Sequence, residues 1–129
     1  MQKTYLILGA LFGALAVAFG AFGAHGLKKI VDADTVAIFQ TGVQYQMYHA
    51  LALLATGILF EKFTNKWVQW AGGAFIIGII LFSGSLYILT ALKAADQGGL
   101  TSVGIVTPFG GLAFIVGWLL LLVGVMKRD

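Results

Sequence analysis

Residues 43–60 read VQYQMYHALALLATGILF, and the two halves of this stretch differ in character. The second half is almost wholly apolar, as expected for a helix that faces lipid. The first half carries five side chains with polar atoms: Gln44, Tyr45, Gln46, Tyr48 and His49. A helix that enters a bilayer with these residues has to place their polar atoms against protein or water, because unsatisfied groups are costly in hydrocarbon.

The composition indicates a membrane protein. Of the 129 residues, 60% are hydrophobic and 10% are charged, and the mean hydropathy is +0.95. A soluble domain carries about 25% charged residues, so this chain lacks the charged surface that water requires. Between short clusters of charge lie four nearly uncharged stretches: residues 4–24, 43–60, 67–90 and 104–126. Each approaches or exceeds the roughly 20 residues that a helix needs to cross about 30 Å of hydrocarbon.

We therefore predict an all-α polytopic membrane protein, a four-transmembrane-helix bundle in which residues 1–129 form a single domain within the lipid bilayer. The net charge of +3 comes from basic residues near the predicted helix ends, where they can face lipid headgroups, and does not indicate nucleic-acid binding. The chain has no cysteine, which excludes disulfides and thiolate chemistry.

Four spans place both termini on one side of the membrane. The termini and the loop at residues 61–66 carry five basic residues, whereas the loops at residues 25–42 and 91–103 carry three. Basic residues are more frequent in cytoplasmic loops, so this bias favours cytoplasmic termini.

Small residues recur along the first predicted span at intervals of four and three: Gly9, Gly13, Ala16, Gly20 and Gly23. This spacing places them in one stripe, where small side chains let another helix approach closely. We interpret the stripe as a helix-packing surface, and it leaves a homo-oligomer open. An ion path along the glycines is the alternative interpretation.

Local signals indicate where the helices begin and end. Asp34 is predicted to cap the second helix and to extend it back to about residue 35. Residues 94–99 predict a break. Pro108 is predicted in the first turn of the last helix, where its missing N–H is tolerated. The three tryptophans, Trp67, Trp70 and Trp118, are predicted to be structural or interfacial anchors.

Polar residues within the predicted spans gather in the half of the membrane opposite the termini. Helical spacing places Gln46 and His49 in one stripe, and Ser83 and Tyr87 in another. We expect the two stripes to meet in one internal polar cluster, with His49 hydrogen-bonded to the third span, to water or to a ligand. The hypothetical ligand-binding residues are His49, Gln46, Tyr48, Gln44, His25, Ser83, Tyr87 and Thr107.

The chemistry of this cluster leaves several functions open. Hydrogen bonding between helices alone would be a structural role, whereas a cavity would admit water, a lipid or a small molecule. Redox alternatives are a quinone held by Tyr48 and His49, or a haem ligated by His25 and His49. The cluster offers too few ligands for zinc, and Ser83 with His49 lacks the acid and the motif of a hydrolase. We therefore predict no catalytic residues, metal or cofactor, and a non-enzymatic membrane component or a subunit of a membrane complex.

Three segments together resemble the domain-of-unknown-function 423 family: GAFGAHGLKK at 20–29, YQMYHALALL at 45–54 and TPFGGLAFIVGWLLL at 107–121. These are small four-helix membrane proteins of bacteria, similar to the eukaryotic transmembrane protein 256. The resemblance covers nearly the whole chain and implies a location in the bacterial inner membrane. It implies no activity for any residue.

Overall fold

The computed structural model describes residues 2–95 and 101–127, which form helices joined by short turns. The first half contains α1 (Lys3–Ala24), a single 3-10 turn η1 (Leu27–Lys29) and α2 (Ala33–Leu59). The second half contains α3 (Lys66–Gly78), a π-helical turn η2 (Ile79–Ser83), α4 (Gly84–Ala94) and α5 (Thr101–Met126). No β-strand occurs in these two described segments, so the predicted all-α class is confirmed.

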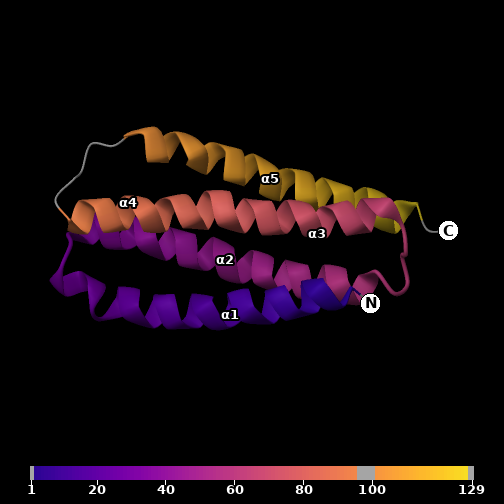
Figure 1. The fold of residues 1–129 in the computed structure, drawn as a ribbon, viewed down its shortest axis with the longest axis horizontal. Helices are drawn as coiled ribbons and strands as arrows, with labels where there is room; N and C mark the ends of the chain where they lie inside the picture. The colour runs from indigo at the N-terminus through magenta and orange to yellow at the C-terminus, as the bar shows by residue number, and fades with distance from the viewer. Residues whose placement is uncertain (1, 96–100, 128–129) are drawn as a thin grey trace.

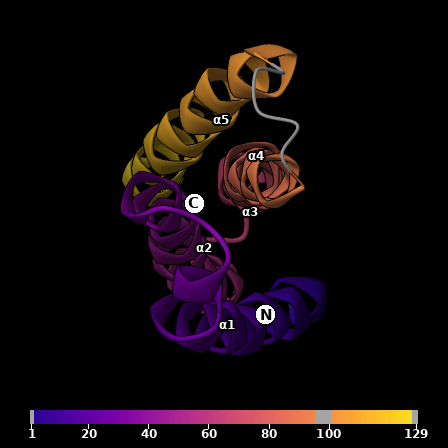
Figure 2. The ribbon, with the colours of Figure 1, turned by 90° about the vertical axis from the view of Figure 1, so that its left-hand side faces the viewer.

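The helices form antiparallel rods, and α3, η2 and α4 follow one another as a single rod (Figure 1). The start of α1 and the end of α5 lie at the same end of the molecule (Figure 1). Seen end-on, α1 and α5 lie on opposite sides of a central pair made by α2 and the α3–α4 rod (Figure 2). Because α2 is central, polar residues on its different faces meet different neighbours.

Three stretches of the described residues are long and apolar enough to cross a membrane: Lys3–Lys29, Lys66–Ala94 and Val103–Met126. Helix α2 is comparably long, with 27 residues. Gln44, Gln46 and His49 lower the hydropathy of its first half. The prediction of membrane-spanning helices is thus supported directly for three of the four predicted spans.

The N-terminus of α2 corrects one sequence prediction. Its capping residue is Asp32, whose carboxylate accepts a hydrogen bond from the Thr35 backbone N–H at 2.9 Å. Asp34, the predicted cap, lies inside the first turn. Hydrogen bonding from Thr35 also holds the pKa of the Asp32 carboxyl below its usual value. The helix begins two residues earlier than predicted because Asp32, not Asp34, has the extended backbone of a cap.

The start of α5 corrects a second prediction. Because α5 begins at Thr101, Pro108 lies inside this helix and not in its first turn. Proline has no N–H, so the carbonyl of Gly104, one turn earlier, lacks its usual helical partner. Helix α4 ends at Ala94, and residues 96–99 of the predicted break lie outside the described residues.

The small-residue stripe of α1 faces α2 along part of its length. Its three buried members are Gly9, Ala16 and Gly23. A Cβ atom on Gly9 would lie 2.8 Å from the Leu54 side chain, so α1 and α2 are close-packed there. A Cβ on Gly20 would lie 3.3 Å from Val43, whereas one on Gly13 would meet no atom within 4 Å. Gly13 therefore shares the spacing of the stripe without being close-packed.

Two groups of buried apolar residues form the core. The larger joins α2, the α3–η2 segment and α5: Ala52, Leu53, Ala71, Phe75, Ile79 and Phe114. The smaller joins α1, η1 and α2: Ala16, Leu27, Phe39 and Val43. Along α2, Gln46 and His49 fall between the residues of these two groups, where the helix contributes its polar side chains.

Candidate functional site

Gln46 connects three helices. Its Nε2 donates to the Phe12 carbonyl of α1 at 2.7 Å, and its Oε1 accepts from the Tyr87 hydroxyl of α4 at 2.6 Å. The side chain is 3% exposed. Both ends of the amide are therefore satisfied by protein, as an amide within a membrane requires.

Two serines near η2 also bond to neighbouring helices. The Ser83 hydroxyl, which is fully buried, donates to the Gly42 carbonyl of α2 at 2.7 Å. The Ser85 hydroxyl lies 2.5 Å from that of Thr107 on α5. Among the described residues, no buried side-chain nitrogen or oxygen lacks a hydrogen-bond partner. The buried polar groups are thus used to join helices.

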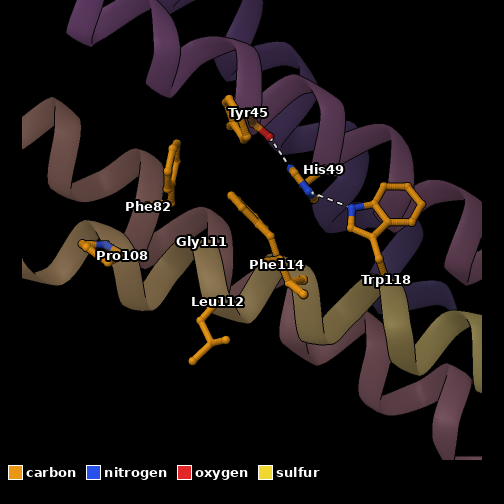
Figure 3. Close-up of a pocket in the computed structure, with 9 residues that line it drawn as sticks. Tyr45, His49, Phe82, Pro108, Gly111, Leu112, Phe114 and Trp118 are labelled. Carbon is orange, nitrogen blue, oxygen red and sulfur yellow. Dashed lines mark hydrogen bonds between the residues drawn. The ribbon is translucent and has the colours of Figure 1, made fainter.

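His49 lies on a different face of α2 and bonds to α5. Its Nδ1 lies 2.7 Å from the Tyr45 carbonyl, and the Trp118 indole Nε1 donates to its Nε2 at 3.1 Å (Figure 3). A carbonyl can only accept and an indole N–H can only donate. The geometry therefore places the proton on Nδ1 and leaves the imidazole neutral.

The imidazole ring also stacks on a neighbouring phenyl ring. The centroids of His49 and Phe114 lie 3.6 Å apart, with an angle of 8° between the planes. The side chain of His49 is only 4% exposed. His49 is thus held by Trp118 and Phe114 of α5, whereas the sequence analysis expected a partner from the third span, water or a ligand.

The predicted polar residues do not form one cluster. Gln46 and Tyr87 bond to each other, Ser83 bonds to the α2 backbone, and His49 and Thr107 each bond to a residue outside the predicted set. The other three are exposed on the helix surface: His25, Gln44 and Tyr48. A spacing of three residues turns a side chain by about 60° around a helix, so Gln46 and His49 reach different neighbours.

The structure instead reveals a groove between α2 and α5, bounded by η2 (Figure 3). It has a volume of about 620 Å³. Its lining is Tyr45, His49, Phe82, Pro108, Gly111, Leu112, Phe114, Ile115 and Trp118. The outer edge is exposed, with Leu112 at 57% and Ile115 at 58%. On a membrane-embedded chain such an edge faces lipid, so the groove opens sideways into the bilayer.

Two interruptions of regular helix border this α2–α5 groove. The π-helical turn Ile79–Ser83 supplies Phe82, and the internal proline of α5 supplies Pro108. Isolated π-helical turns occur frequently at functional sites. The π-helical turn lies near the middle of the α3–α4 rod, whereas Pro108 lies in the first third of α5, ten residues before Trp118.

Sequence reasoning missed most of this lining. The sequence indicates an anchor role for Trp118 and shows Tyr45 only as part of the polar first half of its helix. Phe82, Phe114 and Gly111 carry no polar signal. The one available signal is the position of Trp118 well inside an apolar span, where an indole N–H surrounded by hydrocarbon requires an acceptor.

The two histidines do not face one another. His25 is exposed at the end of α1, and its Nδ1 lies 3.0 Å from the Ala21 carbonyl. His49 lies sixteen residues beyond Ala33, about 24 Å along α2 at 1.5 Å per residue. Two axial ligands must oppose each other across one iron, so this geometry does not support the haem alternative. The described residues contain no group of three His, Cys, Asp or Glu side chains arranged to hold a metal ion.

Comparison with known proteins identifies the family. The model of the family described as "Protein of unknown function (DUF423)" matches residues 19–111. The chain belongs to the DUF423 family. This family membership confirms the resemblance seen in the sequence and classes the chain as a membrane protein of unknown function.

The relatives of this DUF423 protein cover nearly its whole length. It is 45% identical over 126 residues to a UPF0382 membrane protein of Staphylococcus saprophyticus, and the matched region covers 98% of this chain and 99% of the relative. It is 43% identical to the UPF0382 membrane protein YwdK of Bacillus subtilis, with 98% of each chain covered. It is 39% identical to the UPF0382 inner membrane protein YgdD of Escherichia coli, with 98% and 92% covered. No solved structure matches the chain.

Proposed function

We propose that this DUF423 protein is a non-enzymatic component of the bacterial inner membrane that crosses the bilayer four times and binds an apolar molecule taken from the bilayer. The observation that carries the proposal is the α2–α5 groove, which lies at the middle of the helices and is open to lipid. Its volume of about 620 Å³ lies within the range of about 300–1,000 Å³ that is typical of small-molecule sites.

The fourth span in this proposal is α2. It is antiparallel to α1 and to the α3–α4 rod, and its ends lie near theirs (Figure 1). The polar residues that lower its hydropathy include Gln46 and His49, which are buried and hydrogen-bonded to other helices. Bonded in this way, they no longer oppose placement in hydrocarbon.

We expect fusions of alkaline phosphatase, which is active only outside the cytoplasm, to alternate in activity along the chain. Fusions after Val31 and after Ala95 should be active, whereas fusions after Asn65 and after Lys127 should be inactive, because the basic-residue bias favours cytoplasmic termini. Activity after both Val31 and Asn65 would show that α2 does not cross the membrane. The reverse alternation would preserve the four spans and invert the orientation.

The hydrogen bonds of the spans support a non-enzymatic role. A catalytic nucleophile needs an adjacent base and a stabilised oxyanion site. Ser83 instead donates to the Gly42 carbonyl, and both ring nitrogens of His49 are already engaged. Ser83 and His49 make no hydrogen bond with each other among the residues that the structure describes, so the arrangement favours binding over catalysis.

Filling the groove should remove the bound molecule without unfolding the protein. A Cβ on Gly111 would meet only the Phe82 ring, at 3.9 Å, which is an ordinary contact. We therefore expect Gly111→Leu to direct its side chain into the groove and to reduce severalfold the amount of apolar molecule that co-purifies. The measurement is mass spectrometry of organic extracts from equal amounts of purified protein.

The matched control is Gly104→Leu. Gly104 lies on the same helix, outside the groove, and a Cβ there would meet no atom within 4 Å. This variant should retain the bound molecule at the wild-type amount. Equal retention by Gly111→Leu and Gly104→Leu would contradict the proposal that the groove is the binding site.

A further inference from the structure

We propose that the occupant of the α2–α5 groove is a quinone, an uncharged ring that carries two carbonyl oxygens and an apolar tail. This inference rests on the proposed binding of an apolar molecule in the groove and specifies its chemical class. Three features of the groove carry it: one hydroxyl group without a protein partner, a largely aromatic lining, and the lack of charge in the lining.

The unpaired hydroxyl belongs to Tyr45. This side chain lines the groove and is 38% exposed, and its hydroxyl makes no hydrogen bond with the residues that the structure describes. The Tyr45 ring lies 4.7 Å from that of Phe82, which places it at the depth of the π-helical turn in the middle of the rod. Hydrocarbon offers no acceptor at that depth, whereas a carbonyl oxygen of a quinone would accept a hydrogen bond from the Tyr45 O–H.

The rings that line the groove favour a flat ligand. The planes of Tyr45 and His49 differ by 16°, and those of Tyr45 and Phe114 differ by 23°. His49 and Phe114 stack on each other and are each 4% exposed, so the ring surface open to a ligand belongs mainly to Tyr45 and Trp118, which are 38% and 48% exposed. Aromatic rings pack well against such faces in offset or edge-on arrangements, and a saturated chain gains no such contact.

The absence of charge distinguishes a quinone from a phospholipid headgroup. None of the nine lining residues is Lys, Arg, Asp or Glu, so a phosphate in the groove would find no counter-charge. A phospholipid could insert only an acyl chain, which has no atom to accept from Tyr45. His49 does not take the ligand role that the sequence suggested, because Tyr45 and Trp118 already occupy both of its ring nitrogens. Tyr48 lies outside the groove lining.

The test uses full-length protein in phosphatidylcholine nanodiscs, with decylubiquinone as the probe and tryptophan fluorescence as the readout. In a variant with Trp67→Phe and Trp70→Phe, Trp118 is the remaining indole and lies in the groove. We expect decylubiquinone to quench it to a saturating level. In Trp118→Phe protein the remaining tryptophans should show only linear quenching, which reports partition of the quinone into the bilayer.

Tyrosine variants made in the same Trp118-only protein identify the recognised chemistry. Tyr45→Phe removes the proposed donor and should weaken apparent binding by about 2- to 10-fold, since one hydrogen bond contributes about 0.5–1.5 kcal/mol. Tyr48→Phe removes a hydroxyl that is exposed to lipid outside the groove, and it should leave binding unchanged. Equal binding by both variants would overturn the role of Tyr45 and with it the quinone assignment.

A second probe separates this inference from the proposed function. Nanodiscs that contain phospholipid brominated on its acyl chains report whether a chain occupies the groove. One outcome would be that the brominated lipid quenches Trp118 to a saturating level, that Gly111→Leu abolishes this quenching, and that decylubiquinone does not quench. This outcome would overturn the quinone assignment and keep the groove as a lipid-binding site. If neither probe quenches Trp118 in a manner that Gly111→Leu abolishes, the proposed function itself fails.

Discussion

Gly110→Ala is expected to prevent α5 from packing on the π-helical turn, with loss of most of the folded protein. A Cβ on Gly110 would lie 2.3 Å from the backbone nitrogen of Phe82 and 2.7 Å from its Cα. The obstacle is backbone, so no side-chain rotation can relieve it, and the two helices must separate. Overpacking typically costs about 1–3 kcal/mol and occasionally more, and a backbone clash belongs at the upper end of that range.

The neighbouring glycine provides the control for this prediction. Gly111→Ala adds the same methyl group one position along α5, where its nearest contact, the Phe82 ring, is 3.9 Å away. It should be neutral or stabilising by up to about 1 kcal/mol, because alanine is the better helix former. Thermal stability in detergent and the yield of monodisperse protein measure both variants. Similar melting of Gly110→Ala and Gly111→Ala would show that α5 does not pack on η2 as closely as described.

Much of this fold follows from the distribution of charge and apolar residues. Long uncharged stretches can satisfy their backbone in lipid only as helices, so the apolar runs around Leu11, Ile77 and Leu119 directly indicate three candidate membrane-spanning helices. The fourth helix was predictable because its second half, through Leu59, is equally apolar. The exact ends were less predictable, since Asp32 and Asp34 are both competent caps and only the backbone conformation distinguishes them.

The site was much less predictable, because composition does not show which neighbour a polar face will meet. Spacing correctly placed Gln46 and His49 on buried faces of α2. It could not show that α1 and α4 bond Gln46 while α5 bonds His49, since that depends on the packing order of the helices. The groove was further hidden because the π-helical turn that supplies Phe82 has no distinctive sequence.

Gln46→Leu is expected to destabilise the protein by about 1–3 kcal/mol, because it removes two hydrogen bonds at once. The Phe12 carbonyl loses its side-chain donor, and the Tyr87 hydroxyl loses its acceptor inside the membrane. Hydrogen bonds between membrane helices contribute about 0.6 kcal/mol on average, so the stranded Tyr87 hydroxyl accounts for much of the expected loss. Unfolding of the purified protein by a denaturing detergent, followed by circular dichroism, measures the change.

Gln44 and Tyr87 supply the controls that assign this loss to hydrogen bonding. Gln44→Leu makes the same change two residues earlier on an exposed face, so it should be neutral or stabilising. Adding Tyr87→Phe to Gln46→Leu removes the stranded hydroxyl and should recover part of the stability, since replacing both partners by apolar groups can be nearly neutral. If Gln46→Leu proved as neutral as Gln44→Leu, Gln46 would lie on a lipid-facing surface without these hydrogen bonds. Failure of the double variant to recover would mean that Gln46 stabilises the helices by its shape and not by bonding Tyr87.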